Sequence, residues 1–165
     1  DSNLSVDISY GDSRSQLMQN GEITRYNLYN YTITPKFIGK FASWCTFDYQ
    51  MKISMDKMIT DAGKSSSNRY SHSLSLGVTP IKRINIMLSA EHYHSKLSGG
   101  EIKDFILADA AVNFTLTQRL ELRLNASNLF NRQDYSYISV GEMRTSLYSY
   151  SIRPRTIVTG IYLKF

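Results

Sequence analysis

The sequence predicts an all-β fold of antiparallel strands, on two observations. Hydrophobicity alternates with period two over most of the 165 residues, which is the pattern of strands with one apolar and one polar face. No run of 18 apolar residues exists that could cross a membrane as a helix, although strands of about 9 to 11 residues could cross as a barrel. Because a barrel wall meets lipid outside and water inside, we expect antiparallel transmembrane β-barrel strands in a meander.

Four strands are expected in the first half of the chain. The strand over 4–10 sets Leu, Val and Ile against Ser and Asp, and the strand over 29–33 sets Tyr and Ile against Asn and Thr. The strand over 41–53 is the longest of the four, with apolar or aromatic residues at every odd position from 45 onward. The strand over 73–78 sets Leu and Val against Ser and Gly. Each therefore has one face suited to lipid and one suited to water.

Four further strands bring the expected number to eight. The strand over 84–91 sets Ile, Leu and Ala against Asn, Ser and Glu, and the strand over 106–116 sets Ile, Ala, Val and Phe against Asp, Asn and Thr. Leucines alternate with charged and amide residues over 120–125, and the last strand, 157–165, ends on an aromatic residue. The charged residues expected to face the lumen are Asp48, Lys52, Glu91, Asp109, Glu121 and Arg123.

The predicted connections alternate in length. Long polar loops are expected at 12–24, 56–69, 95–103 and 128–147, and short links at 35–40, 81–83 and 117–119. An antiparallel meander places all the long loops at one end, as in outer-membrane barrels. We expect Pro35 to end a strand because it has no N–H for the ladder. Turns at the last two links would set His72 opposite His92 and Phe114 opposite Leu122, so that like faces meet.

About forty residues at the C-terminus carry a motif. The segment Asn128-Leu129-Phe130-Asn131 is followed by Tyr135, by Arg153-Pro154-Arg155-Thr156 and by a strand that ends in Lys164-Phe165. These elements, in this order, resemble the end of TonB-dependent outer-membrane transporters, and are most similar to the Bacteroidetes-type receptors.

That resemblance implies a location and a set of partners. It places the chain in the bacterial outer membrane, in a barrel of about 22 strands with an N-terminal plug. Residues 1–165 would be the C-terminal part of that barrel, without the plug. It also implies energy-coupled import of a scarce nutrient. The implied partners are outer-membrane lipid, the remainder of the barrel and plug, and TonB, which would act through the missing N-terminal part.

The last strand has a further implied role in assembly. By the same resemblance, Gly160, Ile161, Leu163 and Phe165 would form the signal that the β-barrel assembly machinery reads, by strand addition at an open edge. Phe165 is the terminal aromatic residue of this signal.

The predicted loop over 128–147 holds candidate ligand contacts. They are Arg132, Tyr135, Tyr137, Met143 and Arg144. Aromatic rings and guanidinium groups on a rigid rim supply contact area and planar donors at low entropic cost. The alternative is that Tyr135 and its neighbours only anchor the loop to the rim.

The three histidines of the chain are candidate metal ligands. His72, His92 and His94 fall on one outward face if the predicted register is right, and three imidazole nitrogens could hold zinc or copper. The alternative is that these amphipathic rings line the membrane boundary beyond the apolar band.

Other functional classes are disfavoured by the composition. The net charge of +5 comes from scattered Lys and Arg without a basic cluster, which argues against nucleic acid as a partner. One cysteine can form no internal disulfide. No nucleophile and base can be placed together, so we expect neither an enzyme nor a cofactor. Two rival architectures stay open: a self-contained eight-stranded outer-membrane barrel that acts as an anchor or adhesin, and a soluble lipocalin-like barrel whose apolar face holds a hydrophobic ligand.

Overall fold

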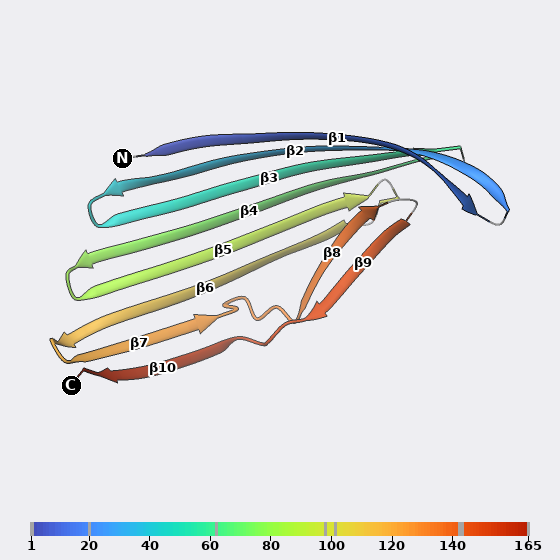
Figure 1. The fold of residues 1–165 in the computed structure, drawn as a ribbon. Coiled ribbons are helices and arrows are strands. Elements are labelled where there is room, and N and C mark those ends of the chain that lie inside the picture. The colour runs from blue at the N-terminus through green and yellow to red at the C-terminus, as the bar shows by residue number, and fades with distance from the viewer. Residues whose placement is uncertain are drawn as a thin grey trace.

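The computed structural model describes residues 2–19, 21–61, 63–97, 99–100, 102–141 and 144–164, and every regular element in them is a strand (Figure 1). The strands are β1 (Asn3–Gln19), β2 (Glu22–Ala42), β3 (Cys45–Thr60), β4 (Gly63–Ile81), β5 (Ile84–Leu97), β6 (Ile102–Thr117), β7 (Leu120–Ser127), β8 (Asp134–Gly141), β9 (Arg144–Ser151) and β10 (Thr156–Leu163). No helix long and apolar enough to cross a membrane occurs among these residues.

Eight of the strands form one antiparallel sheet, and this confirms the all-β meander. Their order is β1-β2-β3-β4-β5-β6-β7-β10, and β8 and β9 form a separate hairpin. The sheet is open, because β1 and β10 are its two edge strands. In Figure 1 the hairpin leaves the chain between β7 and β10 and points toward the far ends of β5 and β6.

The prediction of long polar loops is wrong. Most of the residues over 12–24, 56–69 and 95–103 extend the neighbouring strands, and 128–147 contains β8 and the start of β9. Main-chain hydrogen bonds make these ladders, and they do not require apolar side chains, so strands continue where the apolar alternation stops.

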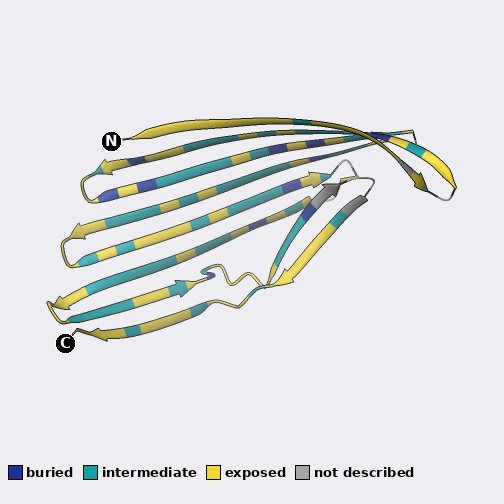
Figure 2. Cartoon of the chain, in the orientation of Figure 1, coloured by how far each residue is buried: buried dark blue, intermediate teal, exposed yellow. Residues whose placement is uncertain are grey.

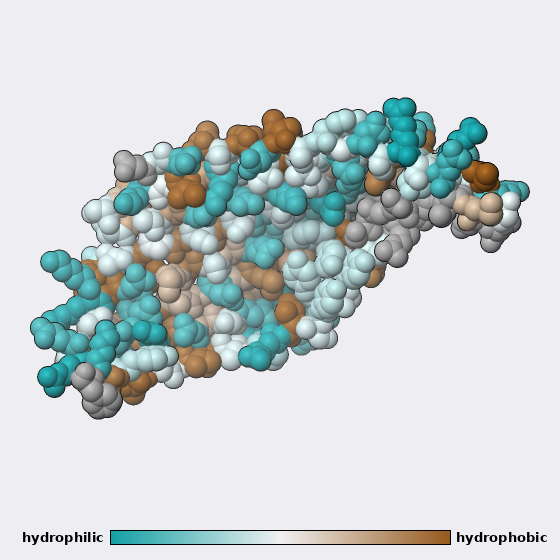
Figure 3. Space-filling model, viewed as in Figure 1, coloured by the Kyte–Doolittle hydropathy of each residue, from teal (hydrophilic) through white to brown (hydrophobic). Residues whose placement is uncertain are grey.

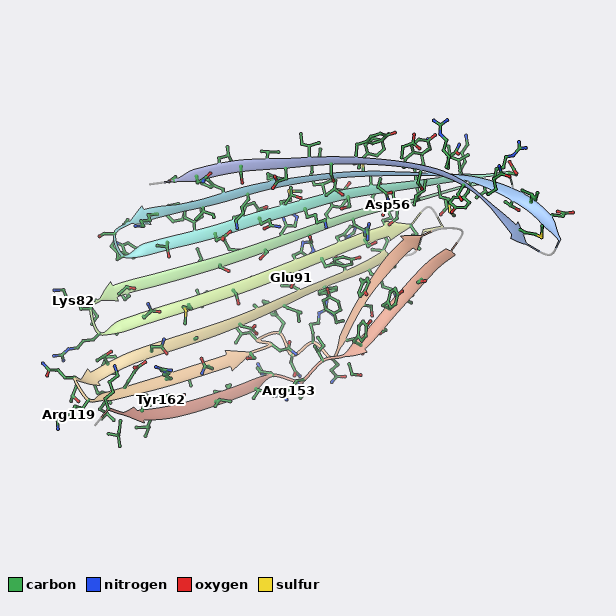
Figure 4. All side chains as sticks on the ribbon, in the orientation of Figure 1. Asp56, Lys82, Glu91, Arg119, Arg153 and Tyr162 are labelled. Carbon is green, nitrogen blue, oxygen red and sulfur yellow. The ribbon has the colours of Figure 1, made fainter. Side chains whose placement is uncertain are left out.

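The short links lie at one end of the sheet, but the link predicted at 35–40 lies instead at residues 43 and 44. The turns are Ser43-Trp44, Lys82-Arg83 and Gln118-Arg119; Lys82 and Arg119 mark that end in Figure 4. Pro35 lies inside β2, opposite Val6 of β1. The register of β2 with β3 has no pair at Pro35, which is where a residue without an N–H is tolerated in a ladder.

The register predicted for two hairpins is confirmed. His72 pairs with His92, and Phe114 pairs with Leu122. Each register shifts by one residue beside its turn, so that the turn itself has two residues rather than three. A bulge of this kind is common where a hairpin closes.

The register gives the sheet two chemically distinct faces. The apolar face carries Leu4, Val6, Ile8, Tyr31, Ile33, Phe37, Phe47, Met51, Ile53, Leu74, Leu76, Ile86, Leu88, Ala110, Val112, Leu122, Leu124, Ile157 and Ile161. The polar face carries all six charged residues that we expected to share one side. Hydrophobic residues project along the edge formed by β1 in Figure 3.

The sheet encloses no core of ordinary size. Its accessible surface is 11452 Å², whereas a folded monomer of 18.9 kDa is expected to expose about 8,300 Å². Leu4, Ile8 and Ile161 on the apolar face are each at least 70% exposed, and β1, β9 and β10 are coloured mainly as exposed in Figure 2. The apolar face and both edges are therefore left open.

The turns are staggered by a constant amount from one hairpin to the next. Gly39, Phe47, Leu76, Leu88 and Ala110 lie on one row of paired residues across β2 to β6. From this row the first turn begins four residues along β2, the second six residues along β4 and the third eight residues along β6. Two residues are about 6.6 Å along a strand and two strands about 9.6 Å across the sheet, which corresponds to a strand tilt of about 35°.

Candidate functional site on the polar face

A hollow of about 610 Å³ lies on the sheet and is lined by residues of six neighbouring strands, β2 to β7. Most of its lining residues belong to the polar face, among them Lys40, Asp48, Ser75, Asp109 and Asn125. Six strands of one sheet can share a hollow only on its concave side. The polar face is therefore concave and the apolar face convex.

The β8–β9 hairpin packs against this polar face. The ring of Tyr135 lies 4.7 Å from that of Phe105 on β6, and Phe105 in turn lies 5.1 Å from Tyr93 on β5. Ile138 in β8 is fully buried. The sequence did contain a signal for the hairpin, because a Tyr-Ser-Tyr segment occurs at 135–137 and again at 148–150.

Aromatic rings continue from the sheet along the hairpin, and we name this set the tyrosine ladder. Tyr137 lies 6.0 Å from Tyr135, and it stacks on Tyr148 at 4.9 Å and on Tyr150 at 6.3 Å. The ladder thus consists of Tyr93, Phe105, Tyr135, Tyr137, Tyr148 and Tyr150. Tyr148 and Tyr150, at its outer end, are 36% and 53% exposed.

The hydroxyls of Tyr135 and Tyr137 are protonated at neutral pH. The hydrogen bond with Tyr150 raises the pKa of Tyr137 above its ordinary value, and burial raises the pKa of Tyr135. The ladder therefore offers flat ring faces together with hydroxyl donors on the concave side of the sheet. The sequence predicted Tyr135 and Tyr137 as site residues; it missed Phe105 and Tyr93, which come from the sheet.

Asn128 fixes the base of the hairpin to the sheet. It is 8% exposed and has a positive φ of 54°, a conformation that Asn tolerates better than most residues. Its Nδ2 donates to the carbonyl oxygens of Arg132 and Arg153, at 2.6 and 2.9 Å, and its Oδ1 accepts from the Arg132 N–H at 2.8 Å. Its own N–H donates to the Asp109 carboxylate on β6 at 2.7 Å. One side chain therefore joins both legs of the hairpin.

Asn131 repeats this arrangement on a smaller scale. Its φ is 52°, and its Oδ1 accepts from the N–H of Arg155 at 2.9 Å. The Asn128-Leu129-Phe130-Asn131 motif is thus a structural clamp, and its two Asn residues were not predicted as site residues.

The remaining residues predicted for ligand contact lie apart from the ladder or outside the described residues. The guanidinium of Arg132 donates to the carbonyl oxygen of Asp104, at 3.3 Å. Arg144 begins β9, but its side chain lies outside the described part of the structure, as does the whole of Met143. Among the predicted residues whose side chains the structure describes, only Tyr135 and Tyr137 therefore lie together.

The C-terminal strand packs as a regular edge strand. Gly160, Ile161 and Leu163 of β10 pair with residues of β7, and Phe165 lies outside the described residues. A Cβ on Gly160 would meet the Tyr162 ring at 2.9 Å. Arg123, which pairs with Gly160, lies over the same ring at 4.1 Å from its centroid. The glycine therefore leaves room for the tyrosine to contact the cation.

The histidines share one face, as predicted, but the three do not converge on one point. The rings of His72 and His92 stack at 5.6 Å. His92 Nε2 and His94 Nδ1 both contact the Asp104 carboxylate, at 3.4 and 2.7 Å, whereas His72 Nδ1 lies 2.8 Å from the Tyr49 hydroxyl. Among the described residues no group of His, Cys, Asp and Glu is arranged to hold a metal ion. The predicted zinc or copper site is therefore not formed.

A buried ion pair holds the far ends of β3 and β4 together on the polar face. Asp56 is 4% exposed and accepts from Arg69 at 2.5 Å and from Asn30 at 2.7 Å. It lies toward the end of the sheet opposite the short turns (Figure 4). The sequence missed this pair because both residues fell in a predicted loop.

Replacing Arg69 by Met is expected to destabilise this end of the sheet by about 3 kcal/mol, because the Asp56 carboxylate would stay buried without its cation. Hydrogen exchange of the adjoining parts of β3 and β4 measures the effect. Lys64→Met is the control, because it removes an exposed cation from the same strand without leaving a buried carboxylate unpaired. Equal exchange in the two variants would contradict a structural role of the pair.

Comparison with protein-family models found no match, and comparisons with curated proteins and with solved structures found none either.

Proposed function

We propose that this chain is a wall segment of a TonB-dependent transporter in the bacterial outer membrane, one that imports a scarce nutrient by energy-coupled transport. The observation that carries the proposal is the apolar face, whose extent along the strands is the same on β2 and β6 once the strand tilt is considered. The resemblance of the C-terminal motif supplies the link to this class of transporter.

The height of the apolar band matches a bilayer. On β2 the apolar face runs from Phe41 to Tyr31, and on β6 it runs from Leu116 to Ile106, which is ten residue steps along the strand in each case. At a tilt of about 35° ten residues span about 27 Å, close to the roughly 25 Å band of outer-membrane barrels.

Aromatic residues lie near both margins of this band. Phe41 and Phe114 lie close to the short turns, and Tyr10, Tyr31 and Tyr70 lie at the other margin. Such girdles are typical of the two membrane interfaces. The tilt itself falls in the range of about 35 to 45° expected for closed barrels.

The open edges and the concave face support a larger barrel. Further strands would pair with β1 and β10, and the resemblance implies that these belong to the rest of the barrel, which also encloses the plug. Import would then proceed by binding of the nutrient to loops and plug, followed by TonB-driven movement of the plug. On this chain the tyrosine ladder is the best candidate for contact with the nutrient, because it reaches into the concave side.

The two rival architectures are less well supported. A closed eight-stranded anchor or adhesin requires β1 to pair with β10, and these are separate edges. A lipocalin-like barrel requires its apolar side chains on the concave side, whereas residues of the polar face line most of the hollow there.

The test of the proposal is the mass of the native polypeptide in outer-membrane fractions, detected by an antibody against residues 128–147. A band several times larger than 18.9 kDa, which can be cross-linked to TonB, is the expected result. A band at 18.9 kDa would instead favour the anchor or adhesin. Absence of the polypeptide from the outer membrane would overturn both.

A further inference from the structure

Basic residues lie at one depth on the convex side, beyond the apolar band. Arg14 on β1, Lys57 on β3 and Lys96 on β5 all belong to the apolar face. Following the paired residues across the sheet from Arg14 leads to Ile59 on β3, which is two residues farther from the short turns than Lys57. Following them from Lys96 leads to Met55 on β3, which is two residues nearer the short turns than Lys57. This offset of two residues for every two strands equals the stagger of the turns. The three cations therefore lie at the same distance from the end of the sheet that carries the short turns.

A second tier follows the same rule. Following the paired residues from Lys64 on β4 leads to Asn27 on β2. Arg25 lies two residues farther from the short turns than Asn27, which is again the stagger of the turns. Arg25 and Lys64 are therefore level with each other, and they lie farther from the apolar band than the first tier. We name these five residues, Arg14, Arg25, Lys57, Lys64 and Lys96, the basic belt.

The basic belt is exposed and carries an excess of positive charge. All five residues are exposed. On the same face and beyond the band, the described carboxylates are Asp12, Asp61 and Asp104. Asp12 pairs with Arg14 at 3.5 Å, Asp61 accepts from a main-chain N–H, and Asp104 pairs with two histidines.

Four cations of the belt are consequently left for an external partner. The side chains of Arg25, Lys57, Lys64 and Lys96 form no salt bridge with a described acidic residue. On the polar face, by contrast, Lys36 is paired with Asp48 and Arg123 with Glu121.

We infer that the basic belt binds the phosphate groups of anionic lipids in the leaflet at the hairpin end of the sheet. The inference rests on the proposed function, because it requires the apolar band to lie in the bilayer. Arg14 lies four residues beyond Tyr10 on β1, which is about 10 Å along the membrane normal at the deduced tilt. That is the headgroup region, and Lys and Arg stems extend along apolar surface while their charges reach the phosphates.

The test uses the full-length protein, freed of lipid in a neutral detergent and titrated with bis-phosphorylated lipid A, with bound lipid counted by native mass spectrometry. Lys57→Gln combined with Lys96→Gln is expected to weaken binding about tenfold or more. Lys40→Gln combined with Lys52→Gln is the matched control, because it removes two exposed lysines from β2 and β3 on the opposite face, and it is expected to leave binding unchanged.

Three outcomes would overturn the inference: equal weakening in both double variants, equal affinity for lipid A whose phosphates have been removed, or full displacement by millimolar inorganic phosphate, which would mark a site for the free ion. A separate readout tests the proposed function. Wild-type protein that fails to insert into neutral phosphatidylcholine vesicles, judged by protease protection, contradicts the membrane wall itself. Insertion without a preference for phosphorylated lipid contradicts only the basic belt.

Discussion

Arginine in place of Leu88 is expected to destabilise the membrane-inserted protein by about 2 to 4 kcal/mol, whereas arginine at the adjacent Ser89 is expected to cost little. Leu88 lies near the middle of the apolar band, in a row with Leu76 and Ala110. A charge there would face hydrocarbon, and the cost is greatest at the midplane of the bilayer. Ser89 points to the polar face and pairs with Asp109, so an arginine there meets water and a carboxylate.

Urea titration of protein folded into phosphatidylcholine vesicles measures both variants on one scale. The two substitutions add the same side chain at neighbouring positions, so their difference reports the faces rather than the residue. An equal loss in both variants would mean that neither face meets lipid. A larger loss for Ser89→Arg would mean that the apolar face is turned inward, as in the lipocalin-like alternative.

Alanine in place of Asn128 is expected to release the β8–β9 hairpin from the sheet. The variant loses three side-chain hydrogen bonds, to Arg132 and Arg153, and leaves main-chain groups of both hairpin legs without partners. It also places alanine, which tolerates a positive φ less well than asparagine, at a φ of 54°. Together these are expected to lower the opening free energy of the hairpin by roughly 3 kcal/mol. Hydrogen exchange over residues 134–151, with β3 as an internal reference, detects the release.

Two further variants separate the causes. Asn128→Gly permits the positive φ but also removes the hydrogen bonds, so it isolates the contribution of the bonds. Asn125→Ala removes an exposed amide from the polar face of the neighbouring strand β7 and is expected to leave hydrogen exchange of the hairpin unchanged. Unchanged exchange in Asn128→Ala would show that Asn128 does not hold the hairpin in place.

Much of the sheet followed from local pattern. Alternation with period two was enough to assign the residues of each face, because successive side chains of a strand point to opposite sides. Together with the positions of the two short turns, it also determined the pairing of His72 with His92 and of Phe114 with Leu122, because a slip of one residue would have set apolar side chains against polar ones. The three histidines were rightly placed on one face, but their ring orientations depend on Tyr49 and Asp104, which lie on other strands.

The sequence by itself determined the all-β class, the two faces and the order of the strands in the meander. Only the tertiary structure decided how far each strand runs, where β8 and β9 lie, and which residues clamp them. The physical reason is that main-chain pairing extends through polar segments that carry no apolar periodicity, so their alternation gives no signal. The clamp at Asn128 and the ladder through Phe105 join segments distant in sequence, and such contacts form only when the sheet brings them together.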